Sequence, residues 1–402
     1  MTDTQAPHPL PLAGLRVVEF VHMVMGPTAG LVLADLGADV IKVEPLKGDA
    51  TRALTNQGAG FFAAYNRNKR SLAVDLKSPE GMAAAKRLIA TADVMTENFR
   101  PGAMAGLGLD YETLAVEHPS LVYCSLKGFL PGPYGHRKAL DEVVQMMAGL
   151  AYMTGPEGRP LRAGASVNDI MGGMFGVIGI LAALRQRETT GRGQEIKAAL
   201  FETTVHIVAQ HMLQFAATGE PAGPMPDRPR AWAVYDVFEA ADGESVFVGV
   251  VSDTQWKLFC ETFERPDLQD DPSLATNPLR CDARERIMPI IREIFGAYPK
   301  AELMDICERI GLPFAPITKP HELYDDPHLK ASGGLLDITL SDGSSTQVPA
   351  LPLEIGGRRL GLRRDLPLTG EHGPEVLAEV GYDDDAIAQL IADGVIKVTA
   401  RS

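Results

Sequence analysis

The residue pair Asn168 and Asp169 is notable because it opens a long apolar run, Met171 to Arg187, that contains repeated glycines. Asparagine and aspartate are preferred at helix N-caps, so the pattern predicts a helix that begins here. A carboxylate in that position gains on the order of 1 kcal/mol from capping and from the helix dipole. The same position suits a nucleophile, because free backbone N–H groups stabilise an ionised carboxylate and any oxyanion charge that forms nearby. The residues alone leave both interpretations of Asp169 open.

Elements that could position such a group alternate along the N-terminal third of the chain. Strands are expected over residues 15–20, 39–44, 93–98 and 121–129, and helices over 26–38 and 78–92. This alternation predicts βαβ units and a parallel, doubly wound sheet of the α/β, Rossmann-like class. Ligands of such sheets bind beyond the carboxyl ends of the strands.

Three basic islands lie in or near the loops that would gather at that edge, at residues 66–70, 99–101 and 136–138. Any one of them taken alone is more often a solvated face. Their common location makes them candidates for binding an anionic ligand.

A stretch rich in proline, glycine and arginine, residues 219–230, marks a domain boundary. The sequence predicts a large domain over residues 1–220 and a smaller α+β domain over residues 226–325. The remaining segment, residues 326–402, contains a hairpin signal about Ser341–Ser345 and a final helical pattern.

Composition excludes several classes of function. The net charge of −14 argues against a nucleic-acid partner, because phosphate binding needs clustered positive charge. No apolar run approaches the roughly 20 residues that span a bilayer, so no membrane segment is expected. The first residues resemble no secretion signal, and four scattered cysteines suggest neither disulfides nor a zinc site. A cytoplasmic protein without a metal is therefore expected.

Motifs of other enzyme classes are absent from the sequence. It contains no Gly-Lys dipeptide and hence no Walker-type loop, and it contains no G-x-S-x-G. The turn after the first predicted strand is VHMVMGP, which lacks the G-x-G-x-x-G of a dinucleotide site. These observations argue against nucleotide hydrolysis, a serine hydrolase and a typical Rossmann oxidoreductase.

A series of segments resembles the family III CoA-transferases in their order. It comprises LAGLRVVEF, GPTAGLVLADLGADVIKVE, NRNKRSLAVDLKSPEG, ADVMTENFRPG, LVYCSLKGF, ASVNDIMGG, GILAALRQRETTGRGQEI and GEHGPEVLAEVGYDDDAIAQLIADGVI. The match runs from about Leu12 to Ile396, and so many segments in one order make it specific.

The resemblance implies a CoA transfer through covalent acyl-aspartate intermediates, with Asp169 at the position of the nucleophile. The partners implied are an acyl-CoA donor, such as succinyl-CoA, and a small carboxylic acid. Coenzyme A is then a substrate rather than a permanently bound cofactor, and no ATP is required. The resemblance also implies an interlocked homodimer, in which the C-terminal segment, residues 326–402, returns to the large domain.

The contacts to CoA that the resemblance implies fall into three groups. The first would lie near the thioester, the second would line the nucleotide, and the third would meet the phosphates and the pantetheine arm. In this sequence they are, respectively, Met23, Val24 and Met25; Val74, Asp75, Lys77, Asn98, Phe99 and Arg100; and Arg137 and Lys138.

Several positions depart from the family pattern. Val24 replaces a glutamine of the oxalate-using members, which makes oxalate a poor substrate candidate. Two arginines of the phosphate shell are replaced by Pro45 and Gly106, for which Lys47 or Arg52 could substitute. Arg228 and Arg230 could grip the far carboxylate of a dicarboxylic acid, although surface solubility explains them equally well.

Two alternatives to CoA transfer stay open at this point, of which the first is a racemase or lyase on the same scaffold. The family also contains α-methylacyl-CoA racemases, but their histidine would fall at Leu140, beside the retained Asp141. Without an imidazole there, one proton-transfer partner is missing and racemisation ranks below transfer. The second alternative is a non-catalytic protein that binds CoA.

Overall fold

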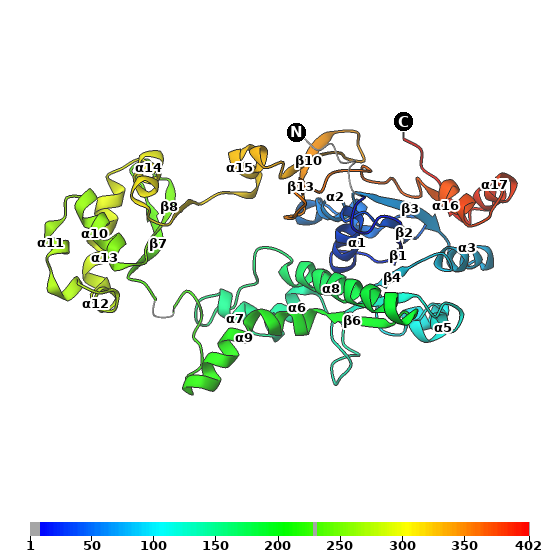
Figure 1. Cartoon of the computed structure of the whole chain (residues 1–402), viewed down its shortest axis with the longest axis horizontal. Coiled ribbons are helices and arrows are strands. Elements are labelled where there is room, and N and C mark those ends of the chain that lie inside the picture. The colour runs from blue at the N-terminus through cyan, green and yellow to red at the C-terminus, as the bar shows by residue number, and fades with distance from the viewer. Residues whose placement is uncertain (1–8, 228–230, 402) are drawn as a thin grey trace. The chain divides into compact units, whose positions relative to one another are not determined.

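The computed structural model describes residues 9–227 and 231–401, and the chain forms two compact units (Figure 1). The larger unit comprises Met1–Pro226 and Pro327–Ser402, and the smaller comprises Asp227–Asp326. The boundary between Pro226 and Asp227 lies inside the stretch rich in proline, glycine and arginine that marks a domain boundary in the sequence.

A seven-stranded sheet forms the centre of the larger unit, in the order β14-β3-β2-β1-β4-β5-β6. All neighbours pair in parallel except β14, which is antiparallel to β3. The predicted parallel sheet is confirmed. Its strands are β1 Arg16–Phe20, β2 Asp39–Glu44, β3 Lys69–Val74, β4 Val94–Glu97, β5 Val122–Lys127, β6 Glu195–Ala199 and β14 Ile396–Lys397.

Strand β3 and the turn before it contain the first basic island, which the structure buries instead of presenting to a ligand. Residues 66–70 are at most 2% exposed. Arg67 Nη2 lies 2.6 Å from Asp35 Oδ2, and Lys69 Nζ lies 2.8 Å from Glu19 Oε1. The expectation that this island binds an anion is wrong, because the positive charges are paired with carboxylates inside the fold.

Helices cover both faces of the sheet (Figure 1). One apolar core joins the sheet to α1 and α8, and a second core on the other face joins it to α3, α16 and α17. The helices of this unit are α1 Met25–Asp35, α2 Phe61–Tyr65, α3 Pro79–Ile89, α4 Ala103–Leu107, α5 Tyr111–Glu117, α6 Asp141–Met147, α7 Leu150–Thr154, α8 Val167–Thr190, α9 Leu200–Thr218, α15 Pro327–Ala331, α16 Gly373–Glu379 and α17 Asp384–Ala392.

The glycines of α8 serve close helix packing. A Cβ on Gly173 would lie 2.6 Å from the main-chain oxygen of Met25 in α1, and one on Gly179 would lie 2.6 Å from Ile196 Cγ2 in β6. Contacts this short leave no room for a side chain. The glycine pattern therefore fixes α8 between α1 and the sheet.

Helix α8 is also long and apolar enough to cross a membrane by length and composition, with a mean hydropathy of 1.7 over its best window. The expectation that no segment meets this criterion is wrong. A core helix of a globular unit passes the same test, and α8 packs against α1, β5 and β6. Only 39% of the window is buried in this chain, so the helix also presents an apolar face outward.

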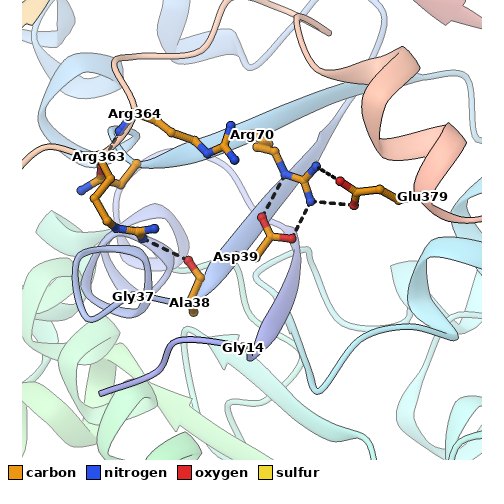
Figure 2. A pocket seen from close by; sticks show the side chains of 9 residues that line it. Gly14, Gly37, Ala38, Asp39, Arg70, Arg363, Arg364 and Glu379 are labelled. Carbon is orange, nitrogen blue, oxygen red and sulfur yellow. Dashed lines mark hydrogen bonds and ion pairs between the residues drawn. The ribbon is translucent and has the colours of Figure 1, made fainter. Parts of the chain in front are cut away.

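The C-terminal segment returns to the larger unit, and Figure 2 shows part of this junction. Arg70 of β3 binds Asp39 of β2, with Nη2 2.5 Å from Oδ2, and Glu379 of α16, with Nη1 2.7 Å from Oε1. Arg363 donates to the main-chain oxygen of Ala38, at 3.3 Å, after the end of α1. Two hairpins precede this junction: β10 Leu335–Thr339 with β11 Ser345–Pro349, and β12 Glu354–Ile355 with β13 Arg358–Arg359.

The smaller unit is an antiparallel sheet with helices around its own apolar core. The strands pair in the order β7-β8-β9, as expected of an α+β domain. Its elements are β7 Val234–Glu239, β8 Ser245–Val250, α10 Asp253–Thr262, α11 Pro266–Gln269, α12 Asn277–Asp282, α13 Arg284–Gly296, α14 Lys300–Ile310 and β9 Phe314–Pro316.

Candidate active site

Asp169 lies in the first turn of α8 but does not cap the helix. The N-cap residue is Ser166, whose side chain makes no capping hydrogen bond. The cap is provided by Asp141 at the start of α6, whose Oδ2 accepts from the backbone N–H of Asn168 at 2.9 Å and of Asp169 at 3.2 Å. The interpretation of Asp169 as a helix cap is therefore wrong, because another carboxylate occupies that position.

The expected free N–H groups of this first turn are also absent over the described residues Val167–Ile170. Val167 donates to the main-chain oxygen of Ala165 at 2.9 Å, and Ile170 donates to that of Ser166 at 3.0 Å. Asp141 takes the two N–H groups between them. The helix end thus offers no unused donor to hold the Asp169 carboxylate.

Burial shifts the pKa of Asp169 upward, whereas the sequence predicts a shift downward. Its pKa is raised to about 7: removal of the carboxyl group from water is the largest cause, the negative charge of Asp141 also raises the pKa, and the positive charge of Arg162 lowers it. The side chain is therefore about half ionised at pH 7. A carboxyl group titrating at the working pH is typical of a catalytic group.

Asp169 lies on a cavity of about 640 Å³ at the carboxyl ends of β1, β4 and β5. The loop 135–140 forms another side of the cavity, and Asp141 also lines it. This is the edge of the sheet at which ligands of parallel sheets bind. The complete lining is His22, Met23, Met25, Asn98, Phe99, Arg100, Pro101, Leu126, Lys127, Gly128, Phe129, Gly135, His136, Arg137, Lys138, Ala139, Leu140, Asp141, Asp169 and Leu200.

The cavity brings together most of the residues that the resemblance assigns to CoA. Besides Asp169, they are Met23, Met25, Asn98, Phe99, Arg100, Arg137 and Lys138. The other predicted contacts are Val24, Val74, Asp75 and Lys77, and none of them lines this cavity. The side chains of Val24 and Val74 are buried at 1% exposure, which leaves only their main chain for a ligand.

The turn after β1 is held rigidly at the cavity wall. The Asn98 side chain accepts from the N–H of His22 at 2.9 Å and donates to its carbonyl at 2.8 Å. The His22 ring stacks on Phe99 with 5.4 Å between centroids, and burial lowers the His22 pKa, so its imidazole is neutral near pH 7. Met23 then adopts a φ of 64°, an uncommon left-handed conformation for a non-glycine residue. A fixed, strained turn of this kind is typical of a ligand site.

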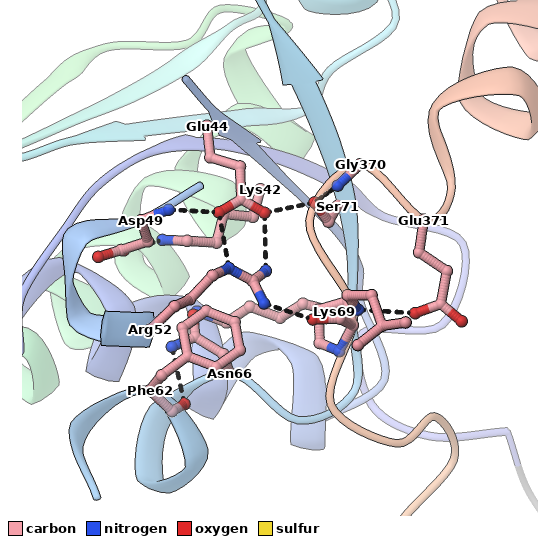
Figure 3. A network of polar contacts seen from close by, with 12 residues as sticks. Lys42, Glu44, Asp49, Arg52, Phe62, Asn66, Lys69, Ser71, Gly370 and Glu371 are labelled. Carbon is pink, nitrogen blue, oxygen red and sulfur yellow. Dashed lines mark hydrogen bonds and ion pairs between the residues drawn. The ribbon is translucent and has the colours of Figure 1, made fainter. Parts of the chain in front are cut away.

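Arg52, one proposed substitute for the missing phosphate-binding arginines, is committed to the protein. Figure 3 shows its guanidinium bound to Glu44 of β2, with Nη2 2.7 Å from Oε1 and Nε 3.0 Å from Oε2. Its Nη1 donates to the carbonyl of Pro367 at 2.8 Å. Arg52 therefore joins the C-terminal segment to the sheet, and of the two substitutes only the exposed Lys47 remains a prediction.

Sequence reasoning missed Lys127, a further cation of the cavity besides Arg100, Arg137 and Lys138. Its ammonium group lies 2.6 Å from Glu97 Oε1 and donates to the carbonyl of Phe99 at 2.7 Å. The only available signal was its position at the end of a predicted strand. Arg228 and Arg230, the suggested grip for a far carboxylate, lie outside the described residues.

Comparisons with known proteins identify the family of this chain. The model of CoA-transferase family III matches residues 12–373. The chain is 37% identical to a succinate–glutarate CoA-transferase of Agrobacterium fabrum over 94% of this chain and 98% of that protein. It is 32% identical to the succinyl-CoA:glutarate CoA-transferase of Mus musculus, over 96% and 90% of the two chains. A crystal structure of a CaiB/BaiF family protein from Brucella suis superposes with a TM-score of 0.84 at 34% identity, covering 93% of this chain and all of that one. This chain belongs to CoA-transferase family III.

Proposed function

We propose that this protein moves CoA from an acyl-CoA donor, succinyl-CoA in the first instance, to a dicarboxylic acid acceptor, with Asp169 as the nucleophile. The observation that carries the proposal is a partly buried carboxyl group with a pKa of about 7, on a cavity whose lining includes the basic side chains of Arg100, Arg137 and Lys138. The names of the two relatives, which act on succinate and glutarate, support a dicarboxylate as the acceptor.

The reaction begins when the ionised Asp169 carboxylate attacks the donor thioester carbonyl. The C–S bond breaks, and a mixed anhydride and the CoA thiolate result. The thiolate then attacks the Asp169 carbonyl of the anhydride, which forms an aspartyl-CoA thioester and releases the donor acid as its carboxylate. The acceptor carboxylate repeats the two steps in reverse, and Asp169 is freed as a carboxylate. One thioester replaces another throughout, so no ATP is consumed.

The basic side chains of the cavity match the charge of CoA. Arg100, Arg137 and Lys138 lie in its lining and suit the phosphate groups, arginine through its planar fork of donors and lysine as a point charge. Arg137 also stacks over the ring of Tyr134, 4.2 Å from its centroid, which orients the guanidinium. CoA is bound here as a substrate, and no permanently bound cofactor is needed for the transfer.

The position at which the family's racemases carry a histidine does not favour racemisation in this protein. Leu140 occupies the position expected of a racemase histidine and is 66% exposed. It supplies no group that could carry a proton. The alternative of a non-catalytic CoA-binding protein is separated from transfer by the experiment below.

We also propose that the protein works as an interlocked homodimer. A broad apolar surface over α6, α7, α8 and α9 supports this, because monomers rarely leave such a surface in water. Its exposed members are Val143, Met146, Met147, Tyr152, Met174, Ile178, Leu181, Met212, Leu213 and Phe215. Sedimentation should give twice the 43.2 kDa chain mass, and a monomer at micromolar concentration would contradict this proposal.

The transfer itself is tested by trapping the covalent intermediates. Succinyl-CoA and acetyl-CoA are offered as donors against a panel of mono- and dicarboxylic acids, and new acyl-CoA is read by mass spectrometry. The wild-type protein should form a CoA adduct on the peptide that carries Asp169 and lose activity in hydroxylamine. An Asp169→Ala protein that exchanges CoA at the native rate would overturn the proposal. Tight CoA binding without exchange across the panel would instead favour a binding protein.

A further inference from the structure

Arg162, in the loop before α8, lies on the far side of the Asp141 carboxylate from the catalytic turn. Asp141 Oδ2 accepts from the N–H groups of Asn168 and Asp169, whereas Arg162 Nη2 lies 3.6 Å from the other oxygen, Oδ1. One carboxylate at the cavity wall therefore separates this guanidinium from the turn that carries the nucleophile. The positive charge of Arg162 interacts electrostatically with Asp169 and opposes the rise in the Asp169 pKa.

The position of Arg162 is fixed through a buried polar network. The N–H of Ala163, the next residue, donates to Gln145 Oε1 at 2.8 Å, and Gln145 Nε2 donates to Asp141 Oδ1 at 2.5 Å. Gln145 is fully buried and Asp141 is 7% exposed. The main chain of the loop is thus tied to α6 beside the cap of α8, which places Arg162 next to Asp141, a residue of the cavity wall.

The guanidinium nevertheless keeps capacity for another partner. Its two carboxylate contacts, 3.6 Å to Asp141 and 3.8 Å from Nη1 to Glu142 Oε2, are longer than hydrogen bonds. Its Nε donates to the carbonyl of Ala163 at 3.1 Å, and the side chain is 38% exposed. The two terminal nitrogens, which form the fork that binds carboxylates, are therefore not taken by close bonds.

We propose that Arg162 determines acceptor specificity by binding the far carboxylate of a dicarboxylic acid whose near carboxylate reacts at Asp169. The inference rests on the proposed function, because it presumes that an acid enters the cavity to react. A short aliphatic dicarboxylate places one charge on the guanidinium fork, and a monocarboxylate of equal length leaves the fork in water. The arginine thereby favours the acid with two charges.

The test compares Arg162→Gln and Arg162→Lys with the wild-type protein on two acids of equal length, glutarate and valerate. The acceptor reacts with an aspartyl-CoA thioester that has already formed, so kcat/KM for the acceptor reports this half-reaction alone. Measurements at pH 8.5 keep Asp169 ionised in all proteins. Loss of a charge-assisted pair should lower kcat/KM for glutarate about 10- to 100-fold in Arg162→Gln. The value for valerate should stay within about twofold, and Arg162→Lys should fall between, since it keeps the charge but not the fork.

Arg185→Gln is the matched control. This arginine is 77% exposed near the other end of α8, and replacing it should change kcat/KM for neither acid. Formation of the aspartyl-CoA adduct from acetyl-CoA serves as the second readout, because acetyl-CoA has no far carboxylate and should react equally in all variants. If valerate is no substrate of either protein, a loss on glutarate with unchanged adduct formation supports the inference.

Two results would overturn the inference while leaving the proposed function intact. If kcat/KM fell equally for glutarate and valerate, Arg162 would act by affecting Asp169 or the loop and not by binding the far carboxylate of the acceptor. An unchanged kcat/KM for glutarate would mean that it does not touch the acceptor at all. A wild-type protein that transfers CoA to no acid would refute the proposed function itself.

Discussion

Replacing Asp169 with asparagine should stabilise the protein, and the gain should grow with pH. The pKa of Asp169 is raised from 3.8 to about 7, chiefly by burial and further by the charge of Asp141, so the native state binds a proton more tightly than the unfolded chain does. Between these two values the unfolded chain carries fewer protons, and stability falls as pH rises. Below the lower value both states are protonated and the effect vanishes.

The magnitude follows from the difference between the two pKa values. Each pKa unit corresponds to about 1.4 kcal/mol, so ionising buried Asp169 costs about 4 kcal/mol above pH 7. At pH 5.5 the same relation between pKa and stability gives a cost of about 2 kcal/mol. The free energy of unfolding gained by Asp169→Asn should therefore be about 2 kcal/mol larger at pH 8.5 than at pH 5.5.

Urea unfolding of both proteins at these two pH values measures the difference. All measurements use one protein concentration, because the unfolding of the proposed dimer would depend on concentration. Any change in packing caused by the amide is common to both pH values and cancels. An Asp110→Asn protein is the control: the N–H of Thr113 lowers the pKa of Asp110 below 3.8, so this carboxyl group is ionised in both states at pH 5.5 and 8.5 and the stability change should be the same at both. A stability change of Asp169→Asn that does not vary with pH would refute the reasoning.

Three other changes give expected outcomes. Asp141→Asn should shift the pH midpoint of adduct formation downward, because the charge that raises the Asp169 pKa is gone, and an upward shift would contradict this role. Arg137→Gln should raise KM for the acyl-CoA about tenfold, less so at high salt, and a salt-independent KM would argue against a phosphate contact. Gly173→Ala should destabilise the fold by about 1 to 3 kcal/mol in urea. Gly106→Ala is its control and should not destabilise the fold, because a Cβ at Gly106 would meet no atom within 4 Å.

The parallel sheet and the family could be predicted because both leave signals in the sequence, whereas the role of Asp169 as nucleophile stays a prediction. β-branched runs between helical patterns mark β1, β2, β4 and β5, and the sequence order around Asp169 matches a family. Strand β3 could not be recognised, since Lys69 and Arg70 look solvent-exposed in the sequence. Their burial depends on Glu19, Asp39 and Glu379, which lie on other elements.

The ionisation of Asp169 could not be predicted for the same reason. A helix start in sequence suggests free N–H groups and a lowered pKa, but Asp141, 28 residues earlier, fills the cap. The largest effect on the pKa of Asp169 is burial, which acts in the opposite direction, and the charge of Asp141 adds to it. Local patterns predict where a side chain lies along an element, whereas its charge state depends on groups that only the fold brings together.

A pKa of about 7 also suits the chemistry that Asp169 is proposed to perform. A carboxylate of higher pKa is a stronger nucleophile, but a smaller fraction of it is ionised at a given pH, so a pKa near the working pH balances the two effects. Ordinary carboxylic acids have a pKa near 4, which makes them the weaker base and the better leaving group of a mixed anhydride with Asp169. The donor acid leaves when the CoA thiolate attacks the Asp169 carbonyl of the anhydride. Attack at this carbonyl is favoured over attack at the donor carbonyl, because it expels the donor carboxylate, which is the weaker base. Burial of Asp169 therefore costs stability but promotes both the attack on the thioester and the release of the donor acid.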